Sequence, residues 1–373
     1  MTKETMPIAD SRVPVSVVVG FLGSGKTTLL NHLLTERHGQ KIAVIVNDFS
    51  ELNIDARLVH RSDERLVEMS NGCICCTLRE DLLRELRALA DIAGLEYILI
   101  ESTGIGEPMP IAQTFYMEDL PERVRLDSIV TVVDSSSFWR DYERSDVIED
   151  AEGNPTTSSL APLLVDQLEF TNVVLLNKTD KAEAEAVHSL EGFIKRLNPG
   201  AHIYRTSFGA VDPACLIDTG LYDYETGMEA EGWETEWAND GGEAEAYGFS
   251  SFVYRQAEPL VWQKFLRVFE AWPLSVIRAK GFVAFADHNP VLLSLAAEDL
   301  RLEELQAGEL SPEAAAALSP EERLAYDKAL AEQADGIKDE VGATEIVLIG
   351  RNMPEAELRR LFDACVLTGR FGA

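Results

Sequence analysis

The 373-residue chain is 46% hydrophobic and carries 64 acidic against 33 basic residues, for a net charge of −31. This excess of negative charge disfavours binding to the phosphate backbone of nucleic acids, and no apolar stretch approaches the roughly 18 residues of a membrane span. The first residues, MTKETMPIADSR, lack the apolar core of a secretory signal, so we expect a cytoplasmic protein. The length leaves room for two domains.

The first part of the chain alternates apolar runs with helical patterns. Such runs are typical of strands that are buried on both faces of a parallel sheet, with helices in the connections. We therefore predict an α/β domain over residues 13–215, after a tail at 1–12. The predicted strands lie at 13–19, 42–46, 66–69, 97–100, 129–133, 173–176 and 202–204. The predicted helices lie at 78–93, 111–115, 160–170 and 182–197.

The segment GFLGSGKTT, residues 20–28, fits the phosphate-binding pattern G-x-x-x-x-G-K-[ST]. It lies between a predicted strand and a helical pattern, which is the setting in which backbone N–H groups and a helix N-terminus face an anion. This predicts a sheet of the P-loop NTPase type and disfavours a glycine-rich turn that binds nothing. In such a loop the lysine reaches the terminal phosphates and the threonine ligates Mg²⁺. The predicted nucleotide contacts are Gly23, Ser24, Gly25, Lys26, Thr27 and Thr28, with Lys26 catalytic.

The segment ESTG follows the predicted strand at 97–100. Glu101 can hold Mg²⁺ directly or through water, and the Gly104 N–H can contact the γ-phosphate. We therefore predict Glu101 as a second catalytic residue and, with Thr27, as a magnesium ligand. The alternative is a helix-capping turn before Pro108.

The segment NKTD closes the predicted strand at 173–176. The Asp180 carboxylate can accept from N1–H and the 2-amino group of guanine, which adenine does not offer, and Lys178 can pack its stem along the base. We therefore predict GTP and GDP as ligands, read by Asn177, Lys178 and Asp180. Ser207 is either a further nucleotide contact or an ordinary turn residue.

Three cysteines form C-x-C-C just before a predicted helix: Cys73, Cys75 and Cys76. Thiolates in a protein of the cytoplasm favour a soft or borderline metal, and Glu51 can supply the fourth zinc ligand. A buried cysteine-rich turn and a redox switch are the alternatives. Cys215 and Cys365 stand alone, and we expect them in the core.

Six segments, in this order, resemble the CobW family of P-loop GTPase metallochaperones, closest to its zinc-responsive branch: GFLGSGKTTLLNHLL, VIVNDFSELNIDARLV, EMSNGCICCTLREDLL, ESTGIGEPMPIAQTF, VTVVD and LLNKTD. The resemblance implies GTP hydrolysis coupled to metal binding at the cysteines and to delivery of the metal to a client metalloprotein. It implies the phosphate, magnesium, guanine and metal roles given above. Two departures stand out. Asp48 replaces a glutamate that many members carry, and the six histidines form no cluster.

Some alternatives stay open at this stage. Thiolate sites also bind Co²⁺, so delivery of cobalt or iron is a second hypothesis for the cargo. A regulatory GTP-binding module with redox-sensing or structural cysteines is a third. We find no counterpart of a water-positioning glutamine, which predicts slow hydrolysis that metal or client stimulates. A homo-oligomer also remains open.

Residues 216–246 hold ten Asp or Glu and no Lys or Arg, which predicts a solvated linker. Trp233 and Trp237 within it can dock on the same chain or on a partner. Residues 247–373 predict a smaller α+β domain that resembles the C-terminal domain of the same family. Its predicted elements are a strand in GFSSFVYR, a helix in VWQKFLRVFEAW, a β-hairpin around Lys280 and Gly281, a strand in TEIVLIGR and a helix in PEAELRRLFDACVL.

Two further expectations concern the same domain. Residues 300–339 are rich in Ala and Glu and predict two short acidic helices. Arg278 and Lys280 either meet a partner or the first domain, or are ordinary exposed residues of the hairpin.

Overall fold

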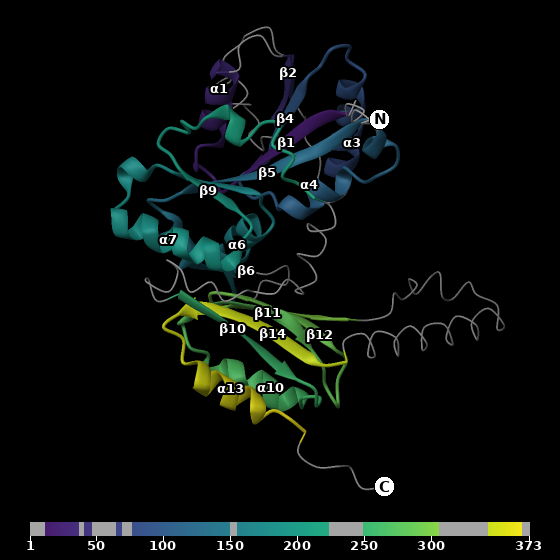
Figure 1. Ribbon diagram of the computed structural model, residues 1–373. Helices are drawn as coiled ribbons and strands as arrows, with labels where there is room; N and C mark the ends of the chain where they lie inside the picture. The colour runs from purple at the N-terminus through teal and green to yellow at the C-terminus, as the bar shows by residue number, and fades with distance from the viewer. Residues whose placement is uncertain are drawn as a thin grey trace, which may run out of the picture. The chain divides into compact units, whose positions relative to one another are not determined.

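The computed structural model describes residues 12–36, 41–46, 65–68, 77–149, 155–223, 249–305 and 342–367. The chain divides into two compact units (Figure 1). The first comprises Met1–Tyr142 and Leu163–Asn239, and the second comprises Glu143–Pro162 and Asp240–Ala373. Within the described residues, no helix is long and apolar enough to cross a membrane.

The first unit contains a seven-stranded sheet in the order β3-β2-β4-β1-β5-β8-β9, in which every neighbouring pair is parallel. Its strands are β1 (Val13–Val19), β2 (Ile42–Val46), β3 (Arg65–Glu68), β4 (Tyr97–Glu101), β5 (Val124–Asp134), β8 (Val173–Asn177) and β9 (His202–Arg205). Its helices are α1 (Lys26–Glu36), α3 (Thr77–Ala90), α4 (Pro108–Thr114), α5 (Phe138–Tyr142), α6 (Ala161–Glu169) and α7 (Ala184–Leu197), with short 3₁₀ turns η1 (Leu120–Glu122), η2 (Thr179–Lys181) and η3 (Pro213–Cys215).

The central strands are buried throughout because helices cover both faces of this sheet. Side chains of a strand alternate between the faces. In β1, Val15 and Val17 pack in one core with Leu82 of α3, whereas Val18 packs in another core with Leu29 of α1. The parallel sheet flanked by helices and a second α+β unit confirm the predicted fold class.

The carboxyl ends of the central strands lie along one edge of this sheet. β1 runs into the segment at 20–28, and its Val18 pairs with Glu101 at the end of β4. On the other side of β1, Asp134 at the end of β5 pairs with Asn177 at the end of β8. In sheets of this kind ligands bind at this edge, at the carboxyl ends of the strands.

Near the opposite end of β5, the buried carboxylate of Asp127 binds the main chain at residues 219–220, where the predicted linker begins. Asp127 is fully buried and accepts hydrogen bonds from Tyr97 Oη (2.6 Å), Thr219 N (2.9 Å), Gly220 N (2.8 Å) and Arg125 Nη1 (2.8 Å). Burial alone would raise the pKa of Asp127, but these hydrogen bonds outweigh it and hold the pKa below its ordinary value. The start of the predicted linker is therefore tied to the sheet.

The second unit is built on a five-stranded antiparallel sheet in the order β10-β14-β11-β12-β13. Its strands are β10 (Phe249–Gln256), β11 (Val276–Val283), β12 (Val291–Ala296), β13 (Asp299–Glu304) and β14 (Thr344–Arg351). Helices α10 (Trp262–Val268) and α13 (Glu355–Asp363) lie side by side on one face, with η4 (Phe269–Ala271) after α10 (Figure 1). A hairpin of β6 (Ser145–Glu149) and β7 (Pro155–Ser159) groups with this unit.

The structure differs from the sequence predictions for the second unit at three places. The hairpin around Lys280 and Gly281 is a single strand, β11, which turns back only at β12. Glycine at position 281 lets β11 approach β14 closely, since a Cβ would lie 2.0 Å from the Glu345 carbonyl oxygen of β14. Arg278 is not an exposed residue. It is 2% exposed and donates to Ser294 Oγ at 2.7 Å. The first residues of the segment at 300–339 belong to strand β13, and the two acidic helices predicted within this segment lie outside the described residues.

Candidate nucleotide-binding site

The phosphate-binding loop (P-loop, residues 20–28) is shaped by glycines that a side chain would displace. Gly20, Gly23 and Gly25 have φ values of 137°, 72° and 110°, which L residues rarely adopt. A Cβ on Gly20 would lie 2.2 Å from the Val132 carbonyl oxygen, and one on Gly25 would lie 2.4 Å from Asn177 Nδ2. The loop is therefore pressed against the ends of β5 and β8. It leads directly into α1, so the N-terminus of this helix lies at the end of the loop.

Two polar side chains of α1 lie at the predicted phosphate and magnesium positions. Lys26 is buried, and its Nζ donates to the carbonyl oxygens of Gly20 (2.8 Å) and Phe21 (3.2 Å), inside the curve of the P-loop. Thr27 Oγ1 donates to Glu101 Oε1 at 2.9 Å. A hydroxyl and a carboxylate in contact are the hard oxygen ligands that Mg²⁺ takes, so this pair fits the ion.

The loop after Glu101 packs on the P-loop. Its start is fixed by Ser102 N, which donates to the Val18 carbonyl oxygen at 2.9 Å. A Cβ on Gly104 would lie 2.4 Å from Leu22 Cδ2, so this position also requires glycine. From α6, the buried Gln167 donates through Nε2 to the Gly106 carbonyl oxygen at 3.1 Å. No local pattern in the sequence indicates a role for this glutamine, because the contact spans 61 residues.

Asn177 joins the P-loop to the loop that follows β9. Its Nδ2 donates to the Ser24 carbonyl oxygen at 2.8 Å, and its Oδ1 accepts from Gly209 N at 3.1 Å. The side chain is 1% exposed, so both contacts are shielded from water. The predicted guanine-reading motif is thus built into the same structure as the predicted phosphate loop.

Lys178 adopts the left-handed backbone conformation, with φ of 58°. Its Nζ donates to the Gly23 carbonyl oxygen at 2.6 Å and to Asp134 Oδ2 at 2.7 Å. Burial alone would raise the pKa of Asp134, but the hydrogen bonds from Lys178 and Ser136 outweigh it and lower the pKa. No local pattern in the sequence indicates the pairing of Asp134 with Lys178, which lies 44 positions away.

Asp180 and Ser207 lie next to each other although 27 residues separate them. The Asp180 main-chain N donates to Ser207 Oγ at 3.3 Å, and Thr179 Oγ1 lies 3.1 Å from the same oxygen. Asp180 is exposed, so its carboxylate is accessible from solvent. Thr28, in the first turn of α1, is exposed as well.

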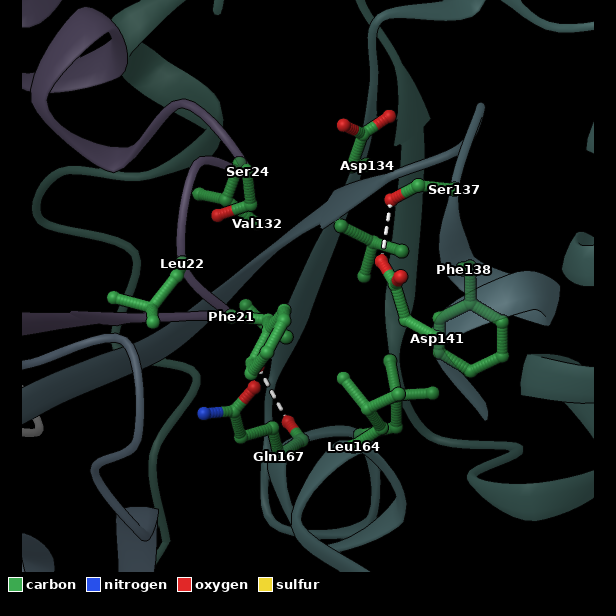
Figure 2. Close-up of a pocket in the computed structure, with 13 residues that line it drawn as sticks. Phe21, Leu22, Ser24, Val132, Asp134, Ser137, Phe138, Asp141, Leu164 and Gln167 are labelled. Carbon is green, nitrogen blue, oxygen red and sulfur yellow. Dashed lines mark hydrogen bonds between the residues drawn. The ribbon is translucent and has the colours of Figure 1, made fainter. Parts of the chain in front are cut away.

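A small pocket borders the P-loop. Figure 2 shows P-loop residues on one side of it and residues of the β5 end and of α5 on the other, with α6 below. Ser24 Oγ is buried here, and no hydrogen-bond partner for it exists among the described residues. This hydroxyl of a predicted nucleotide-contacting residue is therefore free to bond a ligand or water.

The predicted zinc ligands Cys73, Cys75, Cys76 and Glu51 lie outside the described residues. In the ranges that the structure does describe, no group of three or more His, Cys, Asp or Glu side chains could hold a metal. The flanking strand ends are described. β2 ends at Val46, which pairs with Glu68 at the end of β3.

Comparisons with known proteins agree with this architecture. A family model of the CobW/HypB/UreG nucleotide-binding domain matches residues 14–205, and one of the cobalamin synthesis protein cobW C-terminal domain matches residues 249–366. The chain is 43% identical over 310 residues to "Zinc-regulated GTPase metalloprotein activator 1" of Dictyostelium discoideum, which is 76% of this chain and 65% of that protein.

Two other comparisons involve one bacterial protein. The chain is 36% identical over 220 residues to "Zinc chaperone YjiA" of Escherichia coli, which is 57% of this chain and 63% of that protein. This chain therefore covers less than two thirds of the length of each of these two relatives. The solved structure "Zn(II)-bound YjiA GTPase from E. coli" has 23% identity and a TM-score of 0.43, over 95% of this chain and 99% of that chain. The two matching domains, in this order, confirm the resemblance, and the chain belongs to the CobW/HypB/UreG family as a member with a CobW-type C-terminal domain.

Proposed function

We propose that this protein is a GTP-hydrolysing metallochaperone that binds zinc at Cys73, Cys75 and Cys76 and passes it to a client metalloprotein. The observation that carries the proposal is the assembly, at one sheet edge, of the P-loop, the Thr27–Glu101 pair and the Asn177–Asp180 loop. The names of the relatives, a zinc-regulated GTPase metalloprotein activator and a zinc chaperone, support the same activity.

The described residues divide the work of GTP binding and hydrolysis among three loops. The P-loop N–H groups and Lys26 hold the phosphates, while Asp180 reads the guanine edge and Lys178 lines the base. Thr27 and Glu101 would hold Mg²⁺, which supplies positive charge against the charge that develops on the phosphates. The Gly104 N–H adds a donor for the γ-phosphate. Gln167 keeps this loop in place through its bond to Gly106.

The proposed zinc site is joined to the nucleotide site by chain connectivity. Glu51 follows the end of β2, and the three cysteines lie between the end of β3 and the start of α3. β2 also pairs with β4, which ends at Glu101. Contacts to the γ-phosphate and Mg²⁺ order such loops in GTPases, and hydrolysis releases them. A coupling of about 1–3 kcal/mol between nucleotide and metal would change zinc affinity by about 5–150-fold.

The test is a zinc titration of the reduced protein against a competing chelator, first with GDP and then with a non-hydrolysable GTP analogue. We expect a tight 1:1 site whose affinity differs between the two nucleotides and which disappears in a triple Cys→Ser variant. A site indifferent to the nucleotide would make the zinc structural. No zinc site would overturn the proposal. Parallel titrations with Co²⁺ and Fe²⁺ test the alternative cargo.

A further inference from the structure

The loop after β9 contains a tight turn with an aromatic residue in an unfavourable position. The Ala210 N–H donates to the Ser207 carbonyl oxygen at 3.1 Å, which closes a four-residue turn. Both central residues are left-handed, with φ of 58° at Phe208 and 68° at Gly209. Turns with two positive φ values strongly prefer Gly, Asn or Asp at these corners.

Gly209 satisfies that preference, and packing explains why. A Cβ there would lie 2.9 Å from Leu29 Cα of α1, so the second corner is pressed against the helix. The turn is further fixed by Asn177, which accepts from Gly209 N, and by His32 of α1, whose Nε2 lies 2.8 Å from the Val211 carbonyl oxygen. The turn is thus held firmly at its glycine corner.

Phe208 does not follow the preference. A bulky residue at positive φ is strained, and such strain persists mainly where function requires it. The ring is also 70% exposed, so burial within the first unit offsets little of this cost. Phe208 strains the turn and exposes apolar area to water, so it does not stabilise the fold. Contact with a ligand explains its presence better.

The position of the turn indicates which ligand. Phe208 directly follows Ser207, whose hydroxyl contacts Thr179 and the Asp180 main chain. The loop at 178–180 and the turn at 207–210 are therefore in contact, and each carries one exposed residue, Asp180 and Phe208. A carboxylate recognises the edge of a base, and an aromatic ring stacks on its face.

We propose that Phe208 is a nucleotide-binding residue whose ring stacks on the base that Asp180 recognises. This inference rests on the proposed function, because it takes guanine nucleotides as the ligand. Stacking does not depend on the pattern of donors and acceptors on the base. Phe208 therefore adds affinity for GTP and GDP, while Asp180 selects guanine.

The decisive variant is Phe208→Asn, because asparagine tolerates the left-handed conformation. We expect its Tm to rise by about 2–4 °C as the strain is relieved. We also expect its Kd for GDP to rise about tenfold, or 1.4 kcal/mol, as the stacking is lost. A residue with only a structural role would not, when replaced, raise the stability of the protein and lower its affinity for GDP at the same time. Phe208→Tyr should keep the wild-type Kd, and Leu274→Asn, at a site 79% exposed in the second unit, should leave it unchanged.

A second measurement uses Phe208→Trp and follows the emission of the new tryptophan as a difference from the wild-type protein. Addition of GDP should quench it by contact with guanine, whereas Leu274→Trp should not respond. If wild-type protein binds no GDP in calorimetry, the proposed function fails. If the wild type binds GDP but Phe208→Asn binds it equally well and Phe208→Trp is not quenched, only the present inference fails.

Discussion

The contact between Thr27 and Glu101 brings together two side chains that are 74 residues apart in the chain. Glu101 is 4% exposed, and its Oε1 accepts from the Thr27 hydroxyl at 2.9 Å. Glu101 is the last residue of β4, and its pairing with Val18 of β1, just before the P-loop, sets its position. A buried carboxylate at this point is suited to hold a cation against the phosphates.

We predict that Glu101→Gln slows GTP hydrolysis by about 10²–10³-fold, because it removes a negative charge that positions Mg²⁺ near the developing charge. Binding of GDP without Mg²⁺ should stay within a few-fold of wild type. Steady-state phosphate release over a range of Mg²⁺ concentrations measures the effect. Glu107→Gln is the matched control, since Glu107 is an exposed glutamate of the same loop. Wild-type hydrolysis and Mg²⁺ dependence in Glu101→Gln would exclude the proposed role.

At the scale of elements, the P-loop offers a comparison between two glycines. Gly23 and Gly25 both have positive φ, but only at Gly25 would a Cβ meet a neighbouring atom, Asn177 Nδ2 at 2.4 Å. We predict that Gly23→Ala costs about 1–2 kcal/mol through backbone strain alone. Gly25→Ala should lower the free energy of unfolding by more than this and should abolish nucleotide binding, because the loop must move away from Asn177. Urea denaturation and calorimetry with GDP measure both effects. Equal losses of stability and of GDP affinity in the two variants would contradict the prediction.

Buried strands were the most predictable elements. The sequence predicted β1 and β2 residue for residue, and β14 as well, because their apolar runs are continuous. The prediction failed at β11, where Lys280 and Gly281 resembled a turn. Only the neighbouring strand, with Glu345 within 2.0 Å of a Cβ on Gly281, reveals why glycine is needed. The short helix α5 and the hairpin of β6 and β7 were not predicted, since their sequences lack a clear period.

The candidate site was predictable where a local motif carries it. The P-loop and the NKTD segment were located from short patterns, and the roles assigned to their residues remain predictions. Partnerships across the fold were not predictable. Asp134 with Lys178 and Gln167 with Gly106 join residues 44 and 61 positions apart, and no local spacing records such contacts. The unfavourable turn at Phe208 likewise became visible only with its φ value and exposure.

At the scale of the whole molecule, Asp127 connects the stability of the first unit to the segment that leaves it. The pKa of Asp127 is lowered in the folded protein, below the roughly 3.9 of an unfolded aspartate. Its stabilising contribution is therefore present above about pH 4 and is lost as the pH falls through the folded value. Acid should loosen the contacts to Thr219 and Gly220 together with the sheet.

We predict that Asp127→Asn lowers the free energy of unfolding by about 3 kcal/mol at pH 7, because it leaves Arg125 and the main-chain donors without a charged acceptor. The difference from wild type should shrink as the pH falls below about 4, because the unfolded aspartate is protonated there and the folded carboxylate is protonated only at lower pH. Urea denaturation between pH 3 and 7 measures the difference in the free energy of unfolding and its change with pH.

Asp218→Asn is the control for this prediction. Asp218 also pairs with Arg125, but its side chain is 72% exposed, so its loss should cost no more than about 1 kcal/mol. A constant difference between Asp127→Asn and wild type across the pH range would exclude the proposed linkage.

The position of β14 in the second sheet has a consequence for biosynthesis. β14 lies between β10 and β11, yet Phe249 of β10 pairs with Arg351 at its far end. The hydrogen-bond partners of β10 are thus translated only after β11, β12 and β13, and loops of this length close slowly. The seven-stranded sheet of the first unit is complete at Arg205. During synthesis the seven-stranded sheet can therefore form first, while β10 stays unpaired until β14 has been translated.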